Sequence, residues 1–196
     1  MTQDTFTTQQ EIEIKIRLED RAAFQAILPT LGFRVVTPET LERNTLFDTL
    51  DGRLRQTRQL LRIRQYGNRW ILTHKAPSDD SDAMYKVRME SETEIADGQT
   101  LAAIFHLLGY QPAFLYEKLR TEWSDGEGHL VVDVTPIGDY AELEGDPDWI
   151  DATAARLGFT AQQYLAASYG QLFMEWKAAK KHPATNMTFA EINLKG

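Results

Sequence analysis

The sequence contains no cysteine, which excludes disulfide bonds and thiolate metal sites and leaves oxygen or imidazole to hold any metal ion. Histidine is scarce and does not occur at metal-ligand spacing; its four positions are His74, His106, His129 and His182. No hydrophobic run approaches the length of a membrane-spanning helix, and residues 1–10 have neither the basic nor the apolar part of a signal peptide. These absences predict a cytoplasmic protein without a membrane partner.

Charge balance and chain length narrow the class of protein further. The net charge of −8 argues against a general nucleic-acid binder, although a local basic pocket is compatible with it. The 196 residues are 42% hydrophobic, which is enough for one folded core. We predict a single domain over residues 11–176, an N-terminal tail over residues 1–10 and a basic C-terminal extension over residues 177–196.

Residues 11–18, E-I-E-I-K-I-R-L, alternate strictly between charged and aliphatic side chains. Successive side chains of a strand point to opposite faces, so Glu11, Glu13, Lys15 and Arg17 share one face. The aliphatic face is typical of a strand that covers a core. The charged face indicates either a solvated surface or the wall of a ligand site.

The same alternation recurs in later segments. Charged residues with a period of two are Arg62 with Arg64, the run Lys86, Arg88, Glu90, Glu92 and Glu94, Lys118 with Arg120, and Glu142 with Glu144. Lys75 shares a face with Ile71 and Thr73, and Asp133 alternates with Val132 and Val134. Helices covering the aliphatic faces would leave the charged faces inside a closed barrel. Burying unpaired charges is costly, so such a lumen predicts either ligands of both signs or internal ion pairs. Both alternatives stay open at this point.

The expected elements are about eight strands, mostly joined by short turns, with helices in two places. Strand candidates are residues 11–18, 33–36, 42–48, 60–66, 69–75, 84–95, 114–123, 130–135 and 140–144, with a turn at Pro38. Helices are expected after Asp20, Asp97 and Asp146, and from Thr160 through Trp176. Residues 76–83 are predicted to form a solvated, mobile loop, and residues beyond His182 to lie at the surface. Short connections favour antiparallel order and the α+β class.

Five segments together resemble the signature of the CYTH superfamily, the triphosphate tunnel metalloenzymes. They are E-I-E-I-K at 11–15, L-R-I-R at 61–64, L-T-H-K at 72–75, E-K-L-R at 117–120 and E-L-E at 142–144, and F-D at 47–48 and S-Y at 168–169 also fit. One departure is Ala76, where a glycine commonly follows the lysine. The resemblance implies an eight-stranded antiparallel β-barrel with a charged lumen and helices packed outside, which binds a triphosphate together with Mg²⁺ or Mn²⁺.

Carried over position by position, the resemblance implies two sets of ligands. The metal carboxylates are Glu11, Glu13, Glu142 and Glu144. The triphosphate ligands are Lys15, Arg62, Arg64, Lys75, Arg88, Lys118 and Arg120, of which Lys75, Arg62 and Arg64 are also assigned to catalysis. Glu90, Glu92 and Asp133 are expected to be tunnel carboxylates without an assigned role. Crowding of cations further predicts that removing Arg64 or Lys118 relieves repulsion and raises stability.

The signature is common to hydrolases and cyclases, so three functions are considered. The first is a metal-dependent triphosphatase acting on tripolyphosphate or a small organic triphosphate such as ATP or thiamine triphosphate. The second is an adenylyl cyclase that converts ATP to cyclic AMP and pyrophosphate, and the third is a non-catalytic polyphosphate- or nucleotide-binding module. Hydrolysis is preferred because no stretch identifies itself as an adenine pocket. The sequence leaves open the preferred metal and whether the protein forms a homodimer.

Overall fold

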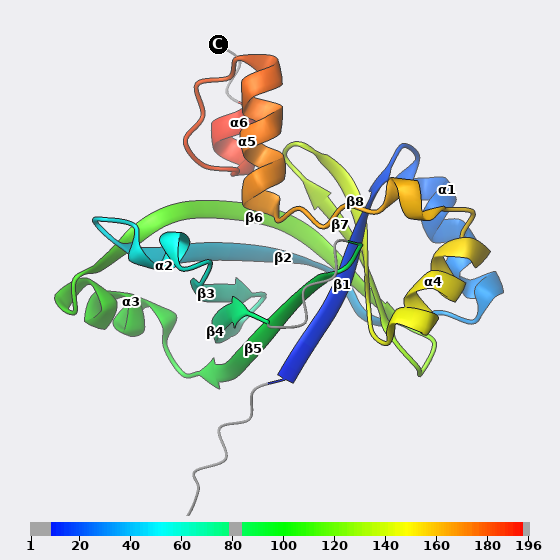
Figure 1. The fold of residues 1–196 in the computed structure, drawn as a ribbon, viewed down its shortest axis with the longest axis horizontal. Helices are drawn as coiled ribbons and strands as arrows, with labels where there is room; N and C mark the ends of the chain where they lie inside the picture. The colour runs from blue at the N-terminus through cyan, green and yellow to red at the C-terminus, as the bar shows by residue number, and fades with distance from the viewer. Residues whose placement is uncertain (1–8, 79–83, 194–196) are drawn as a thin grey trace, which may run out of the picture.

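The computed structural model describes residues 9–78 and 84–193, and its centre is a closed β-barrel (Figure 1). The strands are β1 (Gln9–Leu18), β2 (Arg34–Thr49), β3 (Leu60–Tyr66), β4 (Arg69–Pro77), β5 (Lys86–Ile95), β6 (Tyr110–Ser124), β7 (His129–Thr135) and β8 (Gly138–Glu144). Around the barrel they follow the order β1-β5-β4-β3-β2-β6-β7-β8, and every neighbouring pair is antiparallel. The pairing of β8 with β1 closes the ring, so the predicted eight-stranded antiparallel barrel is confirmed.

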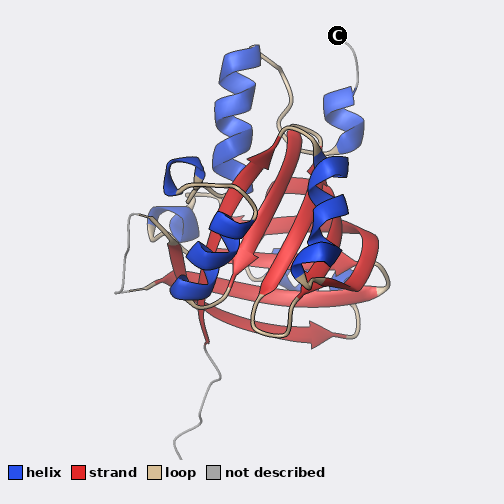
Figure 2. Ribbon diagram, turned by 90° about the vertical axis from the view of Figure 1, so that its right-hand side faces the viewer, coloured by secondary structure: helices blue, strands red, loops and turns tan. Residues whose placement is uncertain are grey.

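Helices lie around the outside of the barrel (Figure 2). They are α1 (Arg21–Ile27), α2 (Arg53–Gln56), α3 (Gly98–Leu107), α4 (Pro147–Arg156), α5 (Tyr169–Lys180) and α6 (Phe189–Asn193), with 3₁₀ turns η1 (Leu28–Leu31) and η2 (Ala161–Gln163). Asp20, Asp97 and Asp146 cap α1, α3 and α4 as predicted, because each carboxylate accepts a backbone N–H of the first turn. Within the described residues, no helix is long and apolar enough to cross a membrane.

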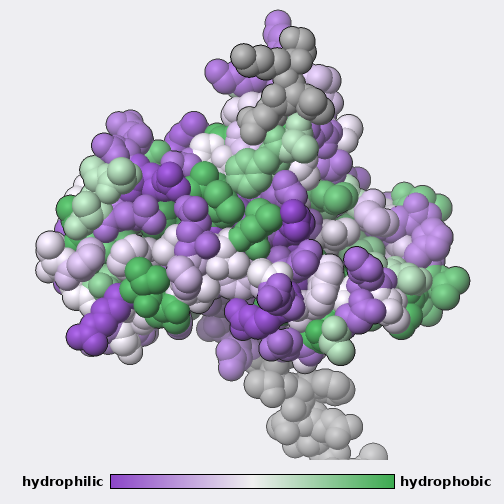
Figure 3. Space-filling view, turned by 180° about the vertical axis from the view of Figure 1, so that it is seen from behind, coloured by the Kyte–Doolittle hydropathy of each residue, from purple (hydrophilic) through white to green (hydrophobic). Residues whose placement is uncertain are grey.

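The hydrophobic core lies between the barrel wall and the helices. Ile14 and Ile16 of β1 belong to one buried cluster with Phe24 of α1 and Ile150 of α4. A second cluster surrounds Phe173 of α5. Burial of each such side chain contributes about 1.5–3 kcal/mol, and turning the aliphatic faces outward directs the charged faces inward, as the alternation predicted. With that apolar wall covered, the face in Figure 3 mixes hydrophobic and hydrophilic side chains.

The predicted turn at Pro38 is wrong, because β2 runs without interruption from Arg34 to Thr49. Its pairing with β6 shifts register between Val35 and Thr37 and again between Thr37 and Thr40. Proline donates no backbone hydrogen bond and is tolerated in a strand at an irregularity of this kind. The two short strands expected here are therefore one long strand with a bulged region at Pro38.

The helix expected from Thr160 is also wrong in its extent. Thr160 and Gln163 form the predicted capping box, but it begins only the single turn η2. Leu165 then exchanges two backbone hydrogen bonds with Lys15, with N···O distances of 3.1 and 2.8 Å. β5 pairs with β1 only over residues 9–13, so the extended segment fills an edge that β5 leaves open. α5 begins after a second capping box, formed by Ser168 and Gln171.

Residues beyond His182 are not all at the surface, contrary to expectation. Ala184 and Met187 are buried, and Met187 exchanges backbone hydrogen bonds with Leu115 and Glu117 of β6. β7 pairs with β6 only from Leu119 onward, which leaves this edge of β6 free for Met187. The chain after η2 thus fills two open edges of the barrel. The limits proposed for the tail and the extension stay predictions.

The loop predicted over residues 76–83 falls mostly outside the described residues. Ala76 and Pro77 still belong to β4, and the description resumes at Met84.

Candidate active site

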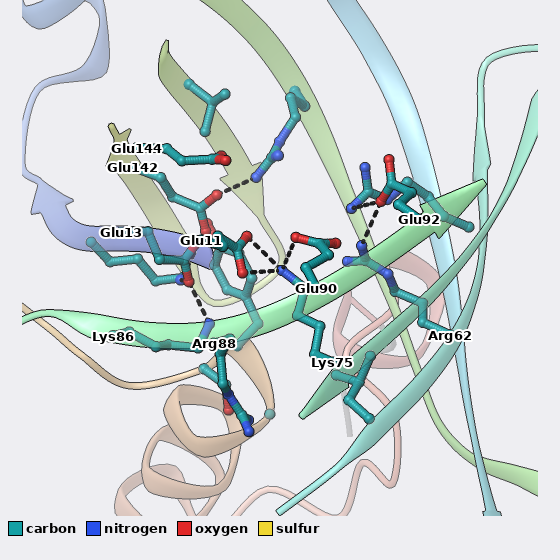
Figure 4. A pocket seen from close by; sticks show the side chains of 18 of the residues that line it. Glu11, Glu13, Arg62, Lys75, Lys86, Arg88, Glu90, Glu92, Glu142 and Glu144 are labelled. Carbon is teal, nitrogen blue, oxygen red and sulfur yellow. Dashed lines mark hydrogen bonds and ion pairs between the residues drawn. The ribbon is translucent and has the colours of Figure 1, made fainter. Parts of the chain in front are cut away.

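A charged cavity of about 530 Å³ occupies the inside of the barrel (Figure 4). The predicted residues that line it are Glu11, Glu13, Lys15, Arg62, Arg64, Lys75, Arg88, Glu90, Glu92, Lys118, Arg120, Glu142 and Glu144. Asp133 is completely buried and does not line the cavity. Arg17 lies outside it as well: its side chain is exposed and its guanidinium lies 5.9 Å from the ring centroid of Tyr140, which it faces across the β1–β8 ladder.

Lys75 joins carboxylates from two neighbouring strands. Its ammonium contacts both carboxylate oxygens of Glu11 and lies 3.1 Å from Glu90 (Figure 4). Burial opposes the charge of Lys75, but Glu11 and the nearby Glu13 outweigh it and raise the pKa of this lysine. Arg88, which also lines the cavity, donates to the carbonyl oxygen of Arg58. This part of the wall is held by ion pairs between β4, β1 and β5.

Lys15 and Glu13 form the centre of a second buried network. The ammonium of Lys15 lies 2.8 Å from Glu13 and 3.0 Å from Glu142, and Glu13 also pairs with Lys86. Burial alone would raise the pKa of Glu13, but Lys15 and Lys86 outweigh it and lower this pKa strongly. The strand register explains the arrangement, since Lys15 faces Glu142 across the β1–β8 ladder and Glu13 faces Glu144.

Lys118 and Arg120 of β6 converge on the buried Asp133 of β7. Lys118 Nζ lies 2.9 Å from Asp133 Oδ2. Arg120 donates from Nε to Asp133 Oδ1 at 2.8 Å and from Nη2 to Asp133 Oδ2 at 2.6 Å. Glu42, which is completely buried, lies 3.4 Å from Lys118. Burial would raise the pKa of Glu42, but Lys118 and Arg64 lower it strongly. Two cations at the cavity wall are thus backed by carboxylates that do not reach the cavity.

Arg62 and Arg64 lie on adjacent inward positions of β3. Their guanidinium groups are 3.7 and 3.9 Å from the Glu92 carboxylate, distances at which the attraction is weak in a half-exposed site. Arg62 also donates to the hydroxyls of Tyr116 and Thr73, each at 3.1 Å. Tyr116 and Thr73 orient Arg62, so it can engage an anion without a large rearrangement.

Glu144 differs from the other predicted metal carboxylates because it forms no ion pair in the described part of the chain, whereas Glu11, Glu13 and Glu142 all do. Although the residue is comparatively exposed, desolvation and repulsion from Glu11 and Glu13 raise the pKa of its carboxyl to about 7. Close carboxylates of like charge are costly, and a bound cation would relieve that cost.

The donor set fits a hard divalent cation in chemistry but is not assembled into a coordination site. Over residues 9–78 and 84–193, no group of three or more His, Cys, Asp or Glu side chains is arranged to hold a metal ion. Carboxylate oxygens are the ligands that Mg²⁺ and Mn²⁺ prefer. Glu11 is paired with Lys75, and Glu13 is paired with Lys15 and Lys86. A metal ion bound by these carboxylates would have to displace the ammonium groups.

Several cavity residues were missed by the sequence reasoning. Glu122, Tyr116 and the apolar Leu46, Leu60 and Phe114 line the cavity, and the buried Glu42 contacts Lys118 behind its wall. Lys86 and Tyr169 also line it; the sequence placed Lys86 on a charged strand face and Tyr169 in the S-Y pair, but assigned no role to either. Glu42 and Leu46 share one face of β2, where they pair with Lys118 and Phe114 of β6. Both lay in the strand expected over residues 42–48, but Glu42 has no charged neighbour at period two that would have marked this face as the inner one. Tyr169 comes from a helix, so no strand alternation could identify it.

The closed antiparallel barrel, with lysines, arginines and glutamates clustered inside, defines a triphosphate tunnel protein. The CYTH domain family model matches residues 9–155, and the chain belongs to this family.

The relatives extend over most of the chain. The adenylate cyclase CyaB of Aeromonas hydrophila is 30% identical over 187 residues, which are 88% of this chain and 93% of that protein. A candidate adenylate cyclase from Vibrio parahaemolyticus has a similar structure, with a TM-score of 0.75, 20% identity and coverage of 86% and 99%. HpAC1 from Hippeastrum, described as having a dominant triphosphatase activity, has a TM-score of 0.62 at 23% identity and covers 84% of this chain and 95% of its own. At these identities, the two structural likenesses concern the fold.

Proposed function

We propose that this protein is a divalent-metal-dependent hydrolase of inorganic triphosphate or of a small organic triphosphate. The observation that carries the proposal is the distribution of charge in the cavity. Glu11, Glu13, Glu142 and Glu144 gather on the adjacent strands β1 and β8. Most of the cations, including both arginines of β3 and the Lys118–Arg120 pair of β6, line the other walls of the same cavity. A polyanion with a divalent cation matches this division.

The carboxylates Glu11, Glu13, Glu142 and Glu144 would hold Mg²⁺ or Mn²⁺. When bound, such an ion supplies Lewis-acid polarisation of phosphate oxygens. Loss of their ion pairs to Glu11 and Glu13 would free Lys75 and Lys15 for the phosphate chain. The protein's own electrostatic contribution then resembles that of other phosphoryl-transfer sites, where positioning and charge neutralisation dominate.

Arg62, Arg64 and Lys75 are the residues proposed to neutralise the charge that develops on the transferred phosphoryl group. The weak contacts of Arg62 and Arg64 to Glu92 leave their donors available for bidentate contact with phosphate oxygens. Tyr116 and Thr73 hold Arg62 in place before substrate arrives, which reduces the reorganisation needed in the reaction.

Adenylyl cyclase is the second candidate, and one observation favours it. Leu46, Leu60 and Phe114 give the cavity an apolar wall that the sequence reasoning did not foresee, and a nucleoside needs such a surface. The relative from Aeromonas hydrophila, which matches 88% of this chain, also carries the name adenylate cyclase. Against this, water needs less positioning than a ribose 3′-hydroxyl that must meet the α-phosphorus. The carboxylates on β1 and β8 disfavour a third reading, a non-catalytic binding module.

One assay separates these functions. The purified protein is incubated with tripolyphosphate, ATP or thiamine triphosphate in the presence of Mg²⁺ or Mn²⁺, and phosphate, pyrophosphate and cyclic AMP are separated and quantified. We expect phosphate from tripolyphosphate and a higher kcat/KM for tripolyphosphate than for ATP. Cyclic AMP as the main product from ATP would replace this proposal by the cyclase. Binding of every triphosphate without turnover would support the binding module.

A further inference from the structure

The first residue of α5, Tyr169, lines the cavity and packs against the charged side chains of its wall. Tyr169 is buried, and its hydroxyl donates to Asp133 Oδ2 at 2.6 Å. Its ring lies 5.2 Å from the ammonium of Lys15 and 4.8 Å from that of Lys118, which are cation–π distances. A single side chain from outside the barrel strands therefore touches a carboxylate and two of the proposed phosphate ligands.

The hydroxyl of Tyr169 shares its acceptor with both cations of β6. Lys118 Nζ and Arg120 Nη2 contact the same Asp133 oxygen, at 2.9 and 2.6 Å. An oxygen that accepts from a third donor presents less charge to each of the other two. Burial and the neighbouring Asp133 raise the pKa of Tyr169 well above its ordinary value, so the hydroxyl keeps its proton. Lys118 and Arg120 thereby retain more capacity to bind an anion in the cavity.

Backbone pairing fixes the place of Tyr169. The two hydrogen bonds between Leu165 and Lys15 dock the preceding segment on β1, and Ser168 caps α5 by accepting from the Gln171 N–H. Beyond α5, Met187 pairs with Leu115 and Glu117 of β6. The chain is thus tied to the barrel before and after α5, so the tyrosine can act as a fixed donor.

We propose that Tyr169 is a positioning residue for triphosphate binding: through Asp133, it keeps Lys118 and Arg120 aimed at the cavity and available to phosphate. This inference rests on the proposed function, because it assumes a triphosphate ligand. It assigns to the helix that follows the barrel a share in the affinity of the tunnel. Asp133 accordingly acts as a support of the cations and has no contact with the ligand.

The test is calorimetric titration with tripolyphosphate at a temperature where circular dichroism shows every variant to be folded. Tyr169→Phe removes only the hydroxyl, and we expect tripolyphosphate to bind about tenfold more weakly. Tyr140→Phe is the matched control, since Tyr140 is buried edge-on against Tyr169, at 5.7 Å between ring centroids, but does not line the cavity. It should change the dissociation constant by less than about twofold.

Two further readouts distinguish positioning from a structural role. If Tyr169 acts through Asp133, Tyr169→Phe should have no added effect on affinity in an Asp133→Asn background. In the wild-type background its effect should appear as a rise in KM with kcat changed by less than about threefold. A lower melting temperature with unchanged affinity, or equal affinities of Tyr169→Phe and wild type, would overturn the inference alone. Should Asp133→Asn not fold, the comparison with Tyr140→Phe still decides. A wild-type protein that does not bind tripolyphosphate would instead overturn the proposed function, and the inference with it.

Discussion

Charged residues of the tunnel are mostly held in ion pairs, and this determines how a single substitution acts. Lys75 contacts Glu11 and Glu90, and Lys15 contacts Glu13 and Glu142, so neither lysine depends on one carboxylate. Removing Glu11 or Glu13 still leaves Lys75 and Lys15 with one carboxylate each. The substitution should therefore cost little free energy of unfolding, but it should strongly weaken the binding of a metal ion that needs all of these carboxylates.

Glu11→Gln and Glu13→Gln are therefore predicted to lower the proposed triphosphatase activity by at least about a hundredfold, equivalent to about 2.7 kcal/mol in the barrier. Both amides nearly preserve the shape of the side chain, and both variants should fold. The measurement is initial rate with tripolyphosphate at limiting Mg²⁺ or Mn²⁺. Glu94→Gln, an exposed carboxylate of β5 outside the cavity, is the control and should retain activity. Near-normal turnover in both tunnel variants would refute the metal assignment.

Lys118→Ala is predicted to destabilise the protein, which reverses the expectation drawn from the sequence. The number of cations in the tunnel suggested that removing Lys118 would relieve repulsion among them. In the structure, however, Lys118 lies between the carboxylates of Asp133 and Glu42, both fully buried. Its removal leaves Asp133 supported by Arg120 and Tyr169 and leaves Glu42 poorly compensated, at a cost of about 1–3 kcal/mol.

The loss should appear in urea unfolding followed by fluorescence. Arg43→Ala removes a surface pair with Glu117, whose atoms lie 3.2 Å apart, and should cost less than about 1 kcal/mol. A Lys118→Ala protein as stable as wild type would show that repulsion among the cations is the larger effect.

At the scale of elements, Asp48 at the end of β2 holds the turn that contains α2. Its carboxylate accepts the backbone N–H groups of Thr49, Leu54 and Arg55, at 2.8, 2.8 and 3.1 Å. Burial would raise the pKa of Asp48, but these hydrogen bonds outweigh it and lower the pKa. The F-D pair at 47–48 thus has a structural explanation, away from the cavity.

Asp48→Asn is predicted to lower the free energy of unfolding at pH 7 by about 1–3 kcal/mol. Because the folded-state pKa is depressed, the contribution of Asp48 is fully present above the unfolded value of about 3.9 and is lost as pH falls through the folded value. The difference between wild type and variant should therefore shrink in acid. Urea unfolding at pH 7 and near pH 3 measures it, with Asp51→Asn in the same turn as control. A difference independent of pH would contradict this account.

Strand alternation made much of the barrel predictable, and the exceptions have physical reasons. Charged and apolar residues alternate in β1, β3 and β8 because one face meets helices and the other meets the cavity. Pro38 suggested a turn, yet a bulge accommodates it within β2. The extended segment at Leu165 depends on an edge of β1 that only the assembled barrel creates. Such long-range pairing leaves little local signal in the sequence.

The candidate site was predictable to a similar degree. Charge on a period of two identified the residues that line the cavity, but Asp133 has the same parity and lies behind its neighbours instead. Whether a side chain such as Asp133 reaches the cavity depends on how Tyr169 and Glu42 pack around Lys118 and Arg120. The sequence of a single strand contains no information about that packing. Glu42 lacked a charged neighbour at period two, since Asn44 and Leu46 follow it on the inward face.

At the scale of the whole molecule, a chain of net charge −8 is proposed to bind a polyanion, which is favourable only if the local field of the cavity outweighs the overall charge. Tripolyphosphate should then stabilise the folded protein by mass action. At a concentration of one hundred times Kd, it should raise the free energy of unfolding by about 2.7 kcal/mol, and the melting temperature rises with it. For a protein of this size that corresponds to a shift on the order of 5–10 °C. Differential scanning fluorimetry with millimolar tripolyphosphate and Mg²⁺, against sulfate at matched ionic strength, measures the shift. Lys118→Ala should reduce it relative to its own ligand-free melting temperature. The absence of any shift in wild type would indicate that the internal ion pairs neutralise the tunnel charges by themselves. It would refute the proposal that a polyanion binds in the cavity.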